Sequence, residues 1–550
     1  MVGTWRLGEI KTRPGTYFRR SSTGVTTAAA TNGILACVFS SNFGALNRVV
    51  DLDQSDLNNL EDVFGTGATI LREGFLGGAT TIRAVRVGGD DGSCSSVVLK
   101  GLVSTSTTTD YEHEFTTSGT DAQLFDLPEN FTTNDLTATS GTNDIKAHIS
   151  VANNKITLAA AAFTNDLIVD NKFKLTWTKT IISSATVDAV EFSAKHPGDK
   201  AFTVTIRTNL ITDERQLLVY VGTNIFDSVS FAAGDDEAQA LVDALANNRN
   251  FTARKITAAP LMDVTQASMT GGVNPTVDVD SYSRATDMLE RYQWNCLVAD
   301  TDDVAVQKLL ISFVKQSYET GHLGFACIAG KSTQDFDARL SFATGINDEK
   351  VVYVLSGWND IYGTAYDGWL AAARIGGMIA AVETNNSLTH STISNALDLI
   401  EPFTNGEITR AEQKGCLVLS LNADDQVQID KAINTLVTVG NDMDAGWSKI
   451  RRVKTRFELM TRINQTCERL VGRLNNDSNG RSTIVAAMQG VIDEMIAEKK
   501  LFFGSNAKLD PDHKPEADRA YFLINVGDID SLEQFYLTYQ FSFANPFEES

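Results

Sequence analysis

The side chains able to act in catalysis are few and widely scattered in this sequence. A serine hydrolase needs a nucleophile with a base and an orienting acid beside it. The chain has no G-x-S-x-G motif, and its six histidines are spread between His113 and His513. His322 follows Gly321 just before an apolar run, and we interpret it as a turn or capping histidine. We therefore expect no catalytic residue and predict that the protein is not an enzyme.

Two runs of carboxylates come nearest to a metal site. Residues 51–62 begin like a calcium loop, but Asp56 stands where the loop needs glycine, and Asp62 stands where it needs glutamate. Residues 300–303 precede an amphipathic stretch, and acids in that position commonly cap a helix and favour its dipole. We expect a helix N-terminus at both places, and neither a metal ion nor a cofactor.

Composition excludes several classes of protein. The chain has 550 residues, of which 43% are hydrophobic, so it can form several domains with cores of their own. Its 47 basic and 69 acidic residues give a net charge of −22, which opposes direct binding of nucleic acid. No apolar stretch reaches the ~20 residues of a membrane span, so we expect no membrane insertion. Six cysteines without a C-x-x-C pair are typical of buried, reduced thiols.

The first half of the chain divides into four segments. Residues 1–30 combine five basic side chains with one acid and are interrupted by Pro14, which predicts an extended arm. Residues 31–90 alternate apolar runs with amphipathic stretches in an α/β pattern. The Thr/Ser-rich residues 91–190 lack arginine, and their short alternating runs predict an inserted antiparallel β-sandwich or barrel. Residues 191–265 read as a strand-rich α+β domain.

The second half has three segments. Residues 266–430 alternate buried strands with helices, which predicts a parallel α/β domain. Residues 431–533 contain two long helical stretches and then a strand, an α+β domain. Residues 534–550 form a terminal strand or arm. The expected fold is thus a multidomain chain of the α/β and α+β classes with extended arms at both ends.

One segment is strongly cationic for so acidic a chain. Residues 449–473 hold eight basic residues and two acids. On a continuous helix, Arg451, Arg462, Arg469 and Arg473 would cluster along one stripe. We predict that this basic stripe faces a partner, although a solvated face with ion pairs inside the chain would produce the same pattern.

The terminal strand, predicted over residues 534–543, alternates apolar and polar residues almost perfectly. Its apolar positions are Phe535, Leu537, Tyr539, Phe541 and Phe543, with Tyr536 among the residues between them. An unpaired strand of this kind is an aggregation hazard, so its own domain or another chain must cover it. From the pattern alone, a strand paired within its own domain is the simpler interpretation.

Short motifs in a fixed order extend along nearly the whole chain. They are Gly3-Thr4-Trp5, Arg13–Tyr17, His196-Pro197-Gly198, Leu217–Tyr220, Ser387-Leu388-Thr389, Gly415–Leu419, Ile433–Leu436, Lys449–Val453, Asn479-Gly480-Arg481 and Asp530–Tyr536. In this order they resemble the tail sheath proteins of contractile bacteriophage tails, including phage-like particles of Gram-positive bacteria.

The resemblance implies a structural subunit of a contractile tail. It implies a subtilisin-like fold for the central domain, stacked hexameric rings around an inner tail tube, and contraction that drives the tube through the host envelope for genome ejection. The partners it implies are further copies of the chain, the tube protein, and the baseplate and tail terminator proteins, in a virion tail assembled in the bacterial cytoplasm. The basic stripe would then face the tube.

The resemblance also assigns a role to the two ends of the chain. The arms would reach neighbouring subunits and complete a β-sheet there. The contacting residues would be Trp5, Arg13, Pro14, Tyr17, Phe535, Tyr536, Leu537, Tyr539 and Phe541. Two alternatives remain open from the sequence: a capsid-like or surface-layer lattice protein, and, further off, an α/β hydrolase.

Overall fold

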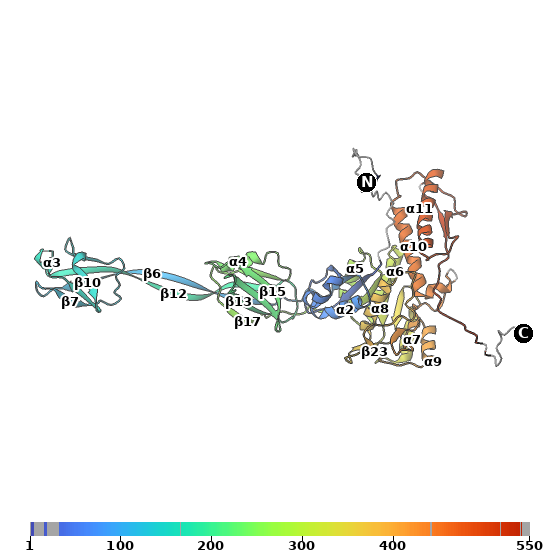
Figure 1. The fold of residues 1–550 in the computed structure, drawn as a ribbon, viewed down its shortest axis with the longest axis horizontal. Coiled ribbons are helices and arrows are strands. Elements are labelled where there is room, and N and C mark those ends of the chain that lie inside the picture. The colour runs from blue at the N-terminus through green and yellow to red at the C-terminus, as the bar shows by residue number, and fades with distance from the viewer. Residues whose placement is uncertain are drawn as a thin grey trace. The chain divides into compact units, whose positions relative to one another are not determined.

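The computed structural model describes residues 2–4, 16–18, 32–165, 167–440, 443–517, 519–539 and 541 (Figure 1). The chain divides into two compact units. Unit 1 contains the N-terminal residues to 94, residues 196–200, and the chain from residue 271 onwards; unit 2 contains residues 95–195 and 201–270. The mixed α/β, multidomain class expected from the sequence is confirmed.

Unit 1 is built on a seven-stranded sheet in which every neighbouring pair except β4 and β5 is parallel. In spatial order the strands are β24 (Cys416–Leu417), β20 (Val351–Val354), β19 (Phe325–Ala329), β18 (Cys296–Ala299), β3 (Ile34–Phe39), β5 (Thr81–Arg86) and β4 (Val49–Asp53). Residues 31–90 and 266–430, which the sequence analysis separates, share this sheet because β3 pairs with β18.

Helices cover both faces of this sheet, so its strands are apolar at successive positions rather than at alternate ones. In β3, Leu35 and Cys37 point into one core, and Ala36 and Val38 into the other. The first core is closed by α1 (Leu60–Phe64), α2 (Ala68–Leu76), α8 (Trp369–Ala381) and α10 (Ile450–Glu468). The second is closed by α5 (Val279–Leu289), α6 (Val304–Glu319), α7 (Phe336–Ile346) and α9 (Asn405–Gln413).

The small residues of α8 let it approach both the sheet and α2. A Cβ at Gly376 would lie 2.6 Å from Val298 Cγ1, and a Cβ at Gly377 would lie 2.3 Å from the Gly74 carbonyl oxygen of α2. At this close approach the Arg374 Nη2 atom reaches Glu73 Oε2 of α2 at 2.8 Å, with both side chains only 3% exposed. The buried ion pair therefore joins α2 to α8 beneath the sheet.

The remaining elements of unit 1 are smaller. Short strands form the set β21 (Trp358–Asp360), β22 (Ala365–Tyr366) and β23 (Ala396–Leu399), and the pair β25 (Leu419–Leu421) and β26 (Val427–Ile429). After α10 come α11 (Ser478–Ala497) and an antiparallel pair, β27 (Asn506–Leu509) and β28 (Phe522–Asn525). These last elements share a separate apolar core with the second half of α10.

Unit 2 contains two very long strands that form an antiparallel ribbon, β6 (Ser96–Thr116) and β12 (Lys172–Ala194) (Figure 1). One end of the ribbon pairs with β16 (Phe251–Lys255) and the other with β8 (Thr137–Ser140). The other strands are β7 (Gln123–Asp126), β9 (Asn143–Asp144), β10 (Ile149–Ala152), β11 (Lys155–Leu158), β13 (Thr203–Thr208), β14 (Arg215–Val221), β15 (Asn224–Phe231) and β17 (Val264–Ser268), with helices α3 (Ala161–Thr164) and α4 (Glu237–Ala244).

The terminal strand predicted over residues 534–543 is not formed within the single chain at the residues that the structure describes there, and its pairing with another chain stays a prediction. Residues 531–539 and 541 form neither helix nor strand. A strand needs backbone partners, and no described segment of the chain supplies them to these residues.

Candidate subunit-assembly site

The C-terminal segment carries the longest run of closely spaced, exposed aromatic and aliphatic side chains in the described chain. The exposed fractions are 72% for Phe535, 89% for Tyr536, 71% for Leu537, 72% for Tyr539 and 94% for Phe541. Its contacts are local, from the Tyr536 hydroxyl to Gln534 and between the Tyr539 and Phe541 rings. A contiguous apolar segment left in water on this scale marks a surface meant for another molecule.

The base of this segment is held by charged side chains, which we call the arm root. Lys449 Nζ lies 2.8 Å from Asp530 Oδ2 and 3.1 Å from Glu533 Oε2. Glu533 also accepts hydrogen bonds from the hydroxyls of Ser387 (3.1 Å) and Thr389 (3.2 Å). The arm therefore leaves the folded unit at a fixed point beside the start of α10.

Asp528 is the most tightly held carboxylate of the arm root. Arg452 donates to both of its oxygens, at 2.7 and 2.8 Å, and Arg456 adds bonds of 3.1 and 3.2 Å. Burial opposes ionisation of this carboxyl, but the two guanidinium groups outweigh burial and lower its pKa to about 2. For Lys449, burial is likewise outweighed, by Asp530 and Glu533, and the pKa is raised.

These shifts predict that the arm root weakens in acid. The pKa of Asp528 is about 2 in the folded chain against an ordinary 3.8, so its stabilising contribution is complete above pH 3.8 and disappears as the pH falls towards 2. We expect Asp528→Asn to lower the free energy of unfolding of unit 1 at neutral pH and to have little effect near pH 2. Urea titrations of both proteins across this range measure the difference, and a difference independent of pH would contradict the prediction.

The basic stripe is not a continuous exposed face, which corrects the sequence prediction. Arg451 and Arg462 are 5% and 7% exposed. Arg451 donates to the Ile529 carbonyl, and Arg462 pairs with Glu458 and with Glu498 (3.0 Å). The prediction failed because a helical projection shows which residues share a side of the helix, but not which side the acids of other segments cover.

The other two arginines of the stripe lie beyond the helix. α10 ends at Glu468, so neither Arg469 nor Arg473 continues its face, and both side chains are exposed. The four arginines predicted to act together thus lie apart: Arg451 is buried at the arm root, Arg462 is buried against Glu458 and Glu498, and the other two lie in the turn after α10.

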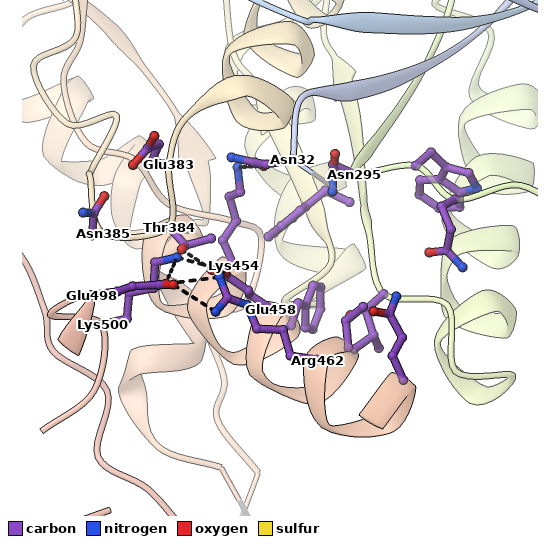
Figure 2. A pocket seen from close by; sticks show the side chains of 17 residues that line it. Asn32, Asn295, Glu383, Thr384, Asn385, Lys454, Glu458, Arg462, Glu498 and Lys500 are labelled. Atoms are coloured by element: carbon purple, nitrogen blue, oxygen red, sulfur yellow. Dashed lines mark hydrogen bonds and ion pairs between the residues drawn. The ribbon is translucent and has the colours of Figure 1, made fainter. Parts of the chain in front are cut away.

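A polar pocket of about 470 Å³ lies between α10, the segment after α8 and the amino ends of β3, β18 and β19 (Figure 2). Lys454 Nζ at its wall donates to the Ile379 carbonyl of α8 (2.6 Å) and to Asn32 Oδ1 (3.1 Å). Glu458 accepts from Lys500 Nζ (2.9 Å), from the Thr384 hydroxyl and from Arg462. Glu458, Arg462 and Lys500 satisfy one another, and Lys454 is held by carbonyl and amide oxygens. Together they tie α10 to the sheet domain and to the end of α11.

An apolar pocket of about 360 Å³ lies on a different part of α10, beside β28. The pocket is lined from the α10 region by Trp447, Leu459, Met460 and Ile463, and from the other side by Ile524 of β28 and by Val526, which follows β28. In the described part of the chain, β27 and β28 pair only with each other. On the outer edge of β27 the Ala507 amide donates to Gln489 Oε1 of α11 (3.0 Å), so the edge open to a further strand is that of β28. A two-stranded sheet is marginal in water, so this one can gain stability from added strands.

Of the N-terminal contact residues, Trp5, Arg13 and Pro14 lie outside the described residues. Tyr17 lies in β2 (Thr16–Phe18), which pairs in parallel with β1 (Val2–Thr4). The contribution of these four residues to assembly stays a prediction.

The carboxylate runs lie where the sequence places helix N-termini. Asp53 caps the 3₁₀ helix Gln54–Asn59, with Asp56 bonding back to the Asp53 backbone amide. Asp303 caps α6, and Asp300 accepts from the Ser40 and Tyr282 hydroxyls. Among the residues that the structure describes, no group of three or more His, Cys, Asp or Glu side chains could hold a metal ion.

The other chemical candidates have structural roles. His322 Nε2 lies 3.2 Å from the Trp294 carbonyl oxygen, and its ring lies 4.4 Å from the Trp294 ring at a turn that begins at Gly321, whose φ is +89°. Burial raises the pKa of the Cys37, Cys296, Cys327 and Cys416 thiols.

In the described ranges, no helix is both long and apolar enough to cross a bilayer.

Comparison with known proteins agrees with the sequence motifs. Residues 276–435 match the family model described as the phage tail sheath protein central domain. A sheath tail protein from Desulfitobacterium hafniense is similar in fold, with a TM-score of 0.61 and 14% identity over 94% of this chain and 100% of the relative. A second, from Listeria innocua, has a TM-score of 0.58 and 15% identity over 91% and 97%.

No curated protein matches the chain in sequence. At 14–15% identity the two structures establish the fold alone, and the sequence evidence comes from the central domain. The resemblance to the sheath proteins of contractile phage tails is thereby confirmed, in sequence over residues 276–435 and in fold over most of the chain.

Proposed function

We propose that the chain is a non-enzymatic, structural subunit of a contractile tail sheath. Its copies stack as hexameric rings around an inner tail tube, and contraction of the sheath drives the tube through the host envelope. The subunit is assembled in the bacterial cytoplasm and becomes part of the virion or particle tail.

One observation carries this proposal: the exposed apolar segment beyond the arm root. Five aromatic or aliphatic side chains between residues 535 and 541 are each at least 71% exposed, while the base of the segment is held by Lys449 and Arg452. Burying such side chains releases about 1.5–3 kcal/mol each. A segment that is held at its base and exposed beyond it is suited to bind a second molecule.

The same chain carries a matching acceptor in the β27–β28 pair. A neighbour's arm in extended conformation would add a strand to a free edge, with backbone hydrogen bonds fixing its register. Because arm residues alternate, Phe535, Leu537 and Tyr539 would face one side together, and the apolar pocket beside β28 offers them Trp447 and Ile463. The partner that supplies both halves of this contact is another copy of the chain.

Such arms fit a lattice that must rearrange without falling apart. A contractile sheath is held in an extended metastable state and shortens when rigid subunits rotate into contacts of lower free energy. Strand-paired arms stay attached during that rotation. The new contacts supply the free energy, so no nucleotide is needed. A seven-stranded, mainly parallel sheet covered on both faces supports the further proposal that the central domain is subtilisin-like.

The remaining partners follow from the same architecture. The inner tube protein contacts the inside of the sheath, and the baseplate and terminator proteins close its ends. Arg451 and Arg462 are buried, so of the four arginines of the stripe only Arg469 and Arg473, after α10, are exposed for a basic contact with the tube.

Polymerisation of the purified chain tests the proposal. We expect sedimentable hollow tubes in negative-stain electron micrographs, and tubes of regular length when the inner tube protein is coexpressed. Flat or closed lattices would favour a surface-layer or capsid-like protein instead, and a chain that stays monomeric at high concentration would contradict the proposal.

The far part of the β6–β12 ribbon is expected to be dispensable for this assembly. Thr105 lies opposite Ser183 in the ribbon, so residues 106–182 can be replaced by Asn-Gly, which closes a two-residue hairpin at that point. The excised residues have an apolar core of their own. We expect a folded variant that still polymerises, as judged by circular dichroism and electron microscopy. An insoluble or non-polymerising variant would contradict this expectation.

A further inference from the structure

Lys454 of α10 is a buried lysine whose recorded partners carry no charge. It is only 6% exposed. Its partners in the described chain are the main-chain carbonyls of Ile379 (2.6 Å), Ala380 (3.3 Å) and Val382, and the side-chain oxygen of Asn32 (3.1 Å). A buried ammonium group without a counter-ion is costly, so burial favours the neutral amine. Burial lowers the pKa of Lys454 to about 7, and a substantial share of the chains therefore carries the neutral amine at neutral pH.

A neutral lysine amine is a nucleophile, and the group beside it here is a primary amide. Lys454 and Asn32 both line the polar pocket (Figure 2). Asn32 Oδ1 lies 3.1 Å from Lys454 Nζ. The amide carbon of Asn32 is at most one carbonyl bond length, about 1.2 Å, farther away. The folded chain therefore holds the amine and the amide carbon near the separation of about 3–3.5 Å from which a bond can form.

The Asn32 amide is also held in one orientation. Its Nδ2 atom donates to the carbonyl oxygens of Val382 (2.9 Å) and Ala381 (3.3 Å), and this turns Oδ1 towards Lys454. The Ile379 and Val382 carbonyls are the nearest acceptors of Lys454 and can take the two N–H donors of a neutral amine. The lone pair of Nζ is then left for the amide carbon.

A second nucleophile near this amide is already engaged. Asn32 is followed by Gly33, and the main-chain nitrogen of the residue after an asparagine can attack the same side-chain carbon. Gly33 N donates to the Ala380 carbonyl at 2.9 Å, so this nitrogen is held in a main-chain hydrogen bond. The geometry therefore favours attack by Lys454.

We propose that Lys454 and Asn32 form an isopeptide bond, which joins α10 covalently to the residues that lead into β3. Lys454 Nζ attacks Cγ of Asn32, the bond from Cγ to Nδ2 breaks, and one proton passes from Nζ to Nδ2, which leaves as ammonia. An amine and a primary amide thus give a secondary amide and ammonia, with no oxidant or other reactant. The pocket, which the Glu458 carboxylate also lines, lets the proton move between the nitrogens and lets ammonia leave.

The bond would lie where the N-terminal arm joins unit 1, because Asn32 is the first residue described after that arm. The C-terminal arm is held by the same helix, through Arg452 and Asp528. A covalent bond does not dissociate under load as a hydrogen bond does, so α10 would hold the N-terminal arm permanently. The bond forms within one subunit, and the inference therefore does not depend on the proposed sheath assembly.

Mass spectrometry of the purified full chain tests the bond. We expect a mass lower than that of the sequence by about 17 Da, the mass of the ammonia released. Trypsin should yield residues 21–48 joined to residues 453–456, because trypsin does not cleave after an acylated lysine. Lys454→Arg and Asn32→Ala should each restore the full mass and separate the peptides. The control is Lys500→Arg, at a lysine of the same pocket that is paired with Glu498 (2.6 Å), and it should retain the bond.

A wild-type chain with the full sequence mass and separate peptides would overturn the proposal. Loss of ammonia that persists in Lys454→Arg would also overturn it, in favour of ring closure between Asn32 and Gly33. Circular dichroism shows whether each variant folds. If Lys454→Arg does not fold, the wild-type digest decides alone, because the joined peptide identifies both residues of the bond and ring closure leaves the peptides separate.

Discussion

A chain that ends at Glu533 is expected to fold and to remain unassembled. The side chains removed are already exposed: Phe535, Leu537, Tyr539 and Phe541 have exposed fractions of 71–94%. The arm root at Asp528, Asp530 and Glu533 is retained. Each lost side chain removes about 1.5–3 kcal/mol from every inter-subunit contact, so the lattice loses most of its stability. Sedimentation and electron microscopy measure the loss, and an unchanged melting temperature shows that the subunit still folds.

A matched pair of single substitutions sharpens this test. Leu537→Ser removes an apolar side chain from the face that carries Phe535 and Tyr539, whereas Tyr536→Ser changes the opposite face. We expect Leu537→Ser to raise the critical concentration for polymerisation more than Tyr536→Ser. Deletion of residues 1–20 should also prevent assembly. Long tubes formed by the chain that ends at Glu533 would exclude strand exchange through the C-terminal arm.

Glu73→Ala is expected to cost about 3–5 kcal/mol of unfolding free energy in unit 1, because it leaves Arg374 buried without its counter-ion. Arg374 Nε and Nη2 lie 3.0 and 2.8 Å from Glu73 Oε2, and the Ser394 carbonyl (2.9 Å) is the only main-chain acceptor recorded for it in the described chain. Both side chains are only 3% exposed, and this burial raises the pKa of Glu73 despite Arg374.

The control is an ion pair in water on the same part of the fold. Glu61 and Arg72 lie 3.0 Å apart, with side chains 70% and 42% exposed. Glu61→Ala should therefore cost at most about 1 kcal/mol. Denaturant unfolding of both variants gives the comparison, and similar small losses for the two would refute the role assigned to the buried pair.

The sequence predicts well those helices and strands whose pattern is contained in their own residues. The continuous apolar runs at β3, β18 and β19 predict buried parallel strands. The apolar residues Val306, Leu310 and Val314, at helical spacing, predict α6. Short strands such as β24 and β26 have too few residues for a pattern. The position of β3 in the middle of the sheet, beside β18, could not be predicted either. The two strands are about 260 residues apart in the chain, and a local sequence pattern does not indicate which distant strands pair.

In the candidate site, too, the local pattern was visible in the sequence but the partners of its residues were not. The alternation of residues 534–541 is plain in the sequence, but no described segment of the chain pairs with it, so the pattern predicts a strand that the isolated subunit does not form. The cationic segment misleads for a related reason: Asp528, Asp530 and Glu498, which neutralise Arg452, Lys449 and Arg462, come from later segments. The acids of residues 527–533 were visible in the sequence, and their pairing with residues 449–456 is the signal that could have located the arm root.

A helical reconstruction of the assembled chain by cryo-electron microscopy tests the central claim most directly. We expect residues 534–541 of each subunit to lie as an added strand on the β27–β28 pair of a neighbouring subunit, with alternate arm side chains in the pocket between Trp447 and Ile524. Tubes in which this segment pairs within its own subunit, or in which the outer edge of β28 stays without an added strand, would contradict the proposal that the subunits are joined through their arms.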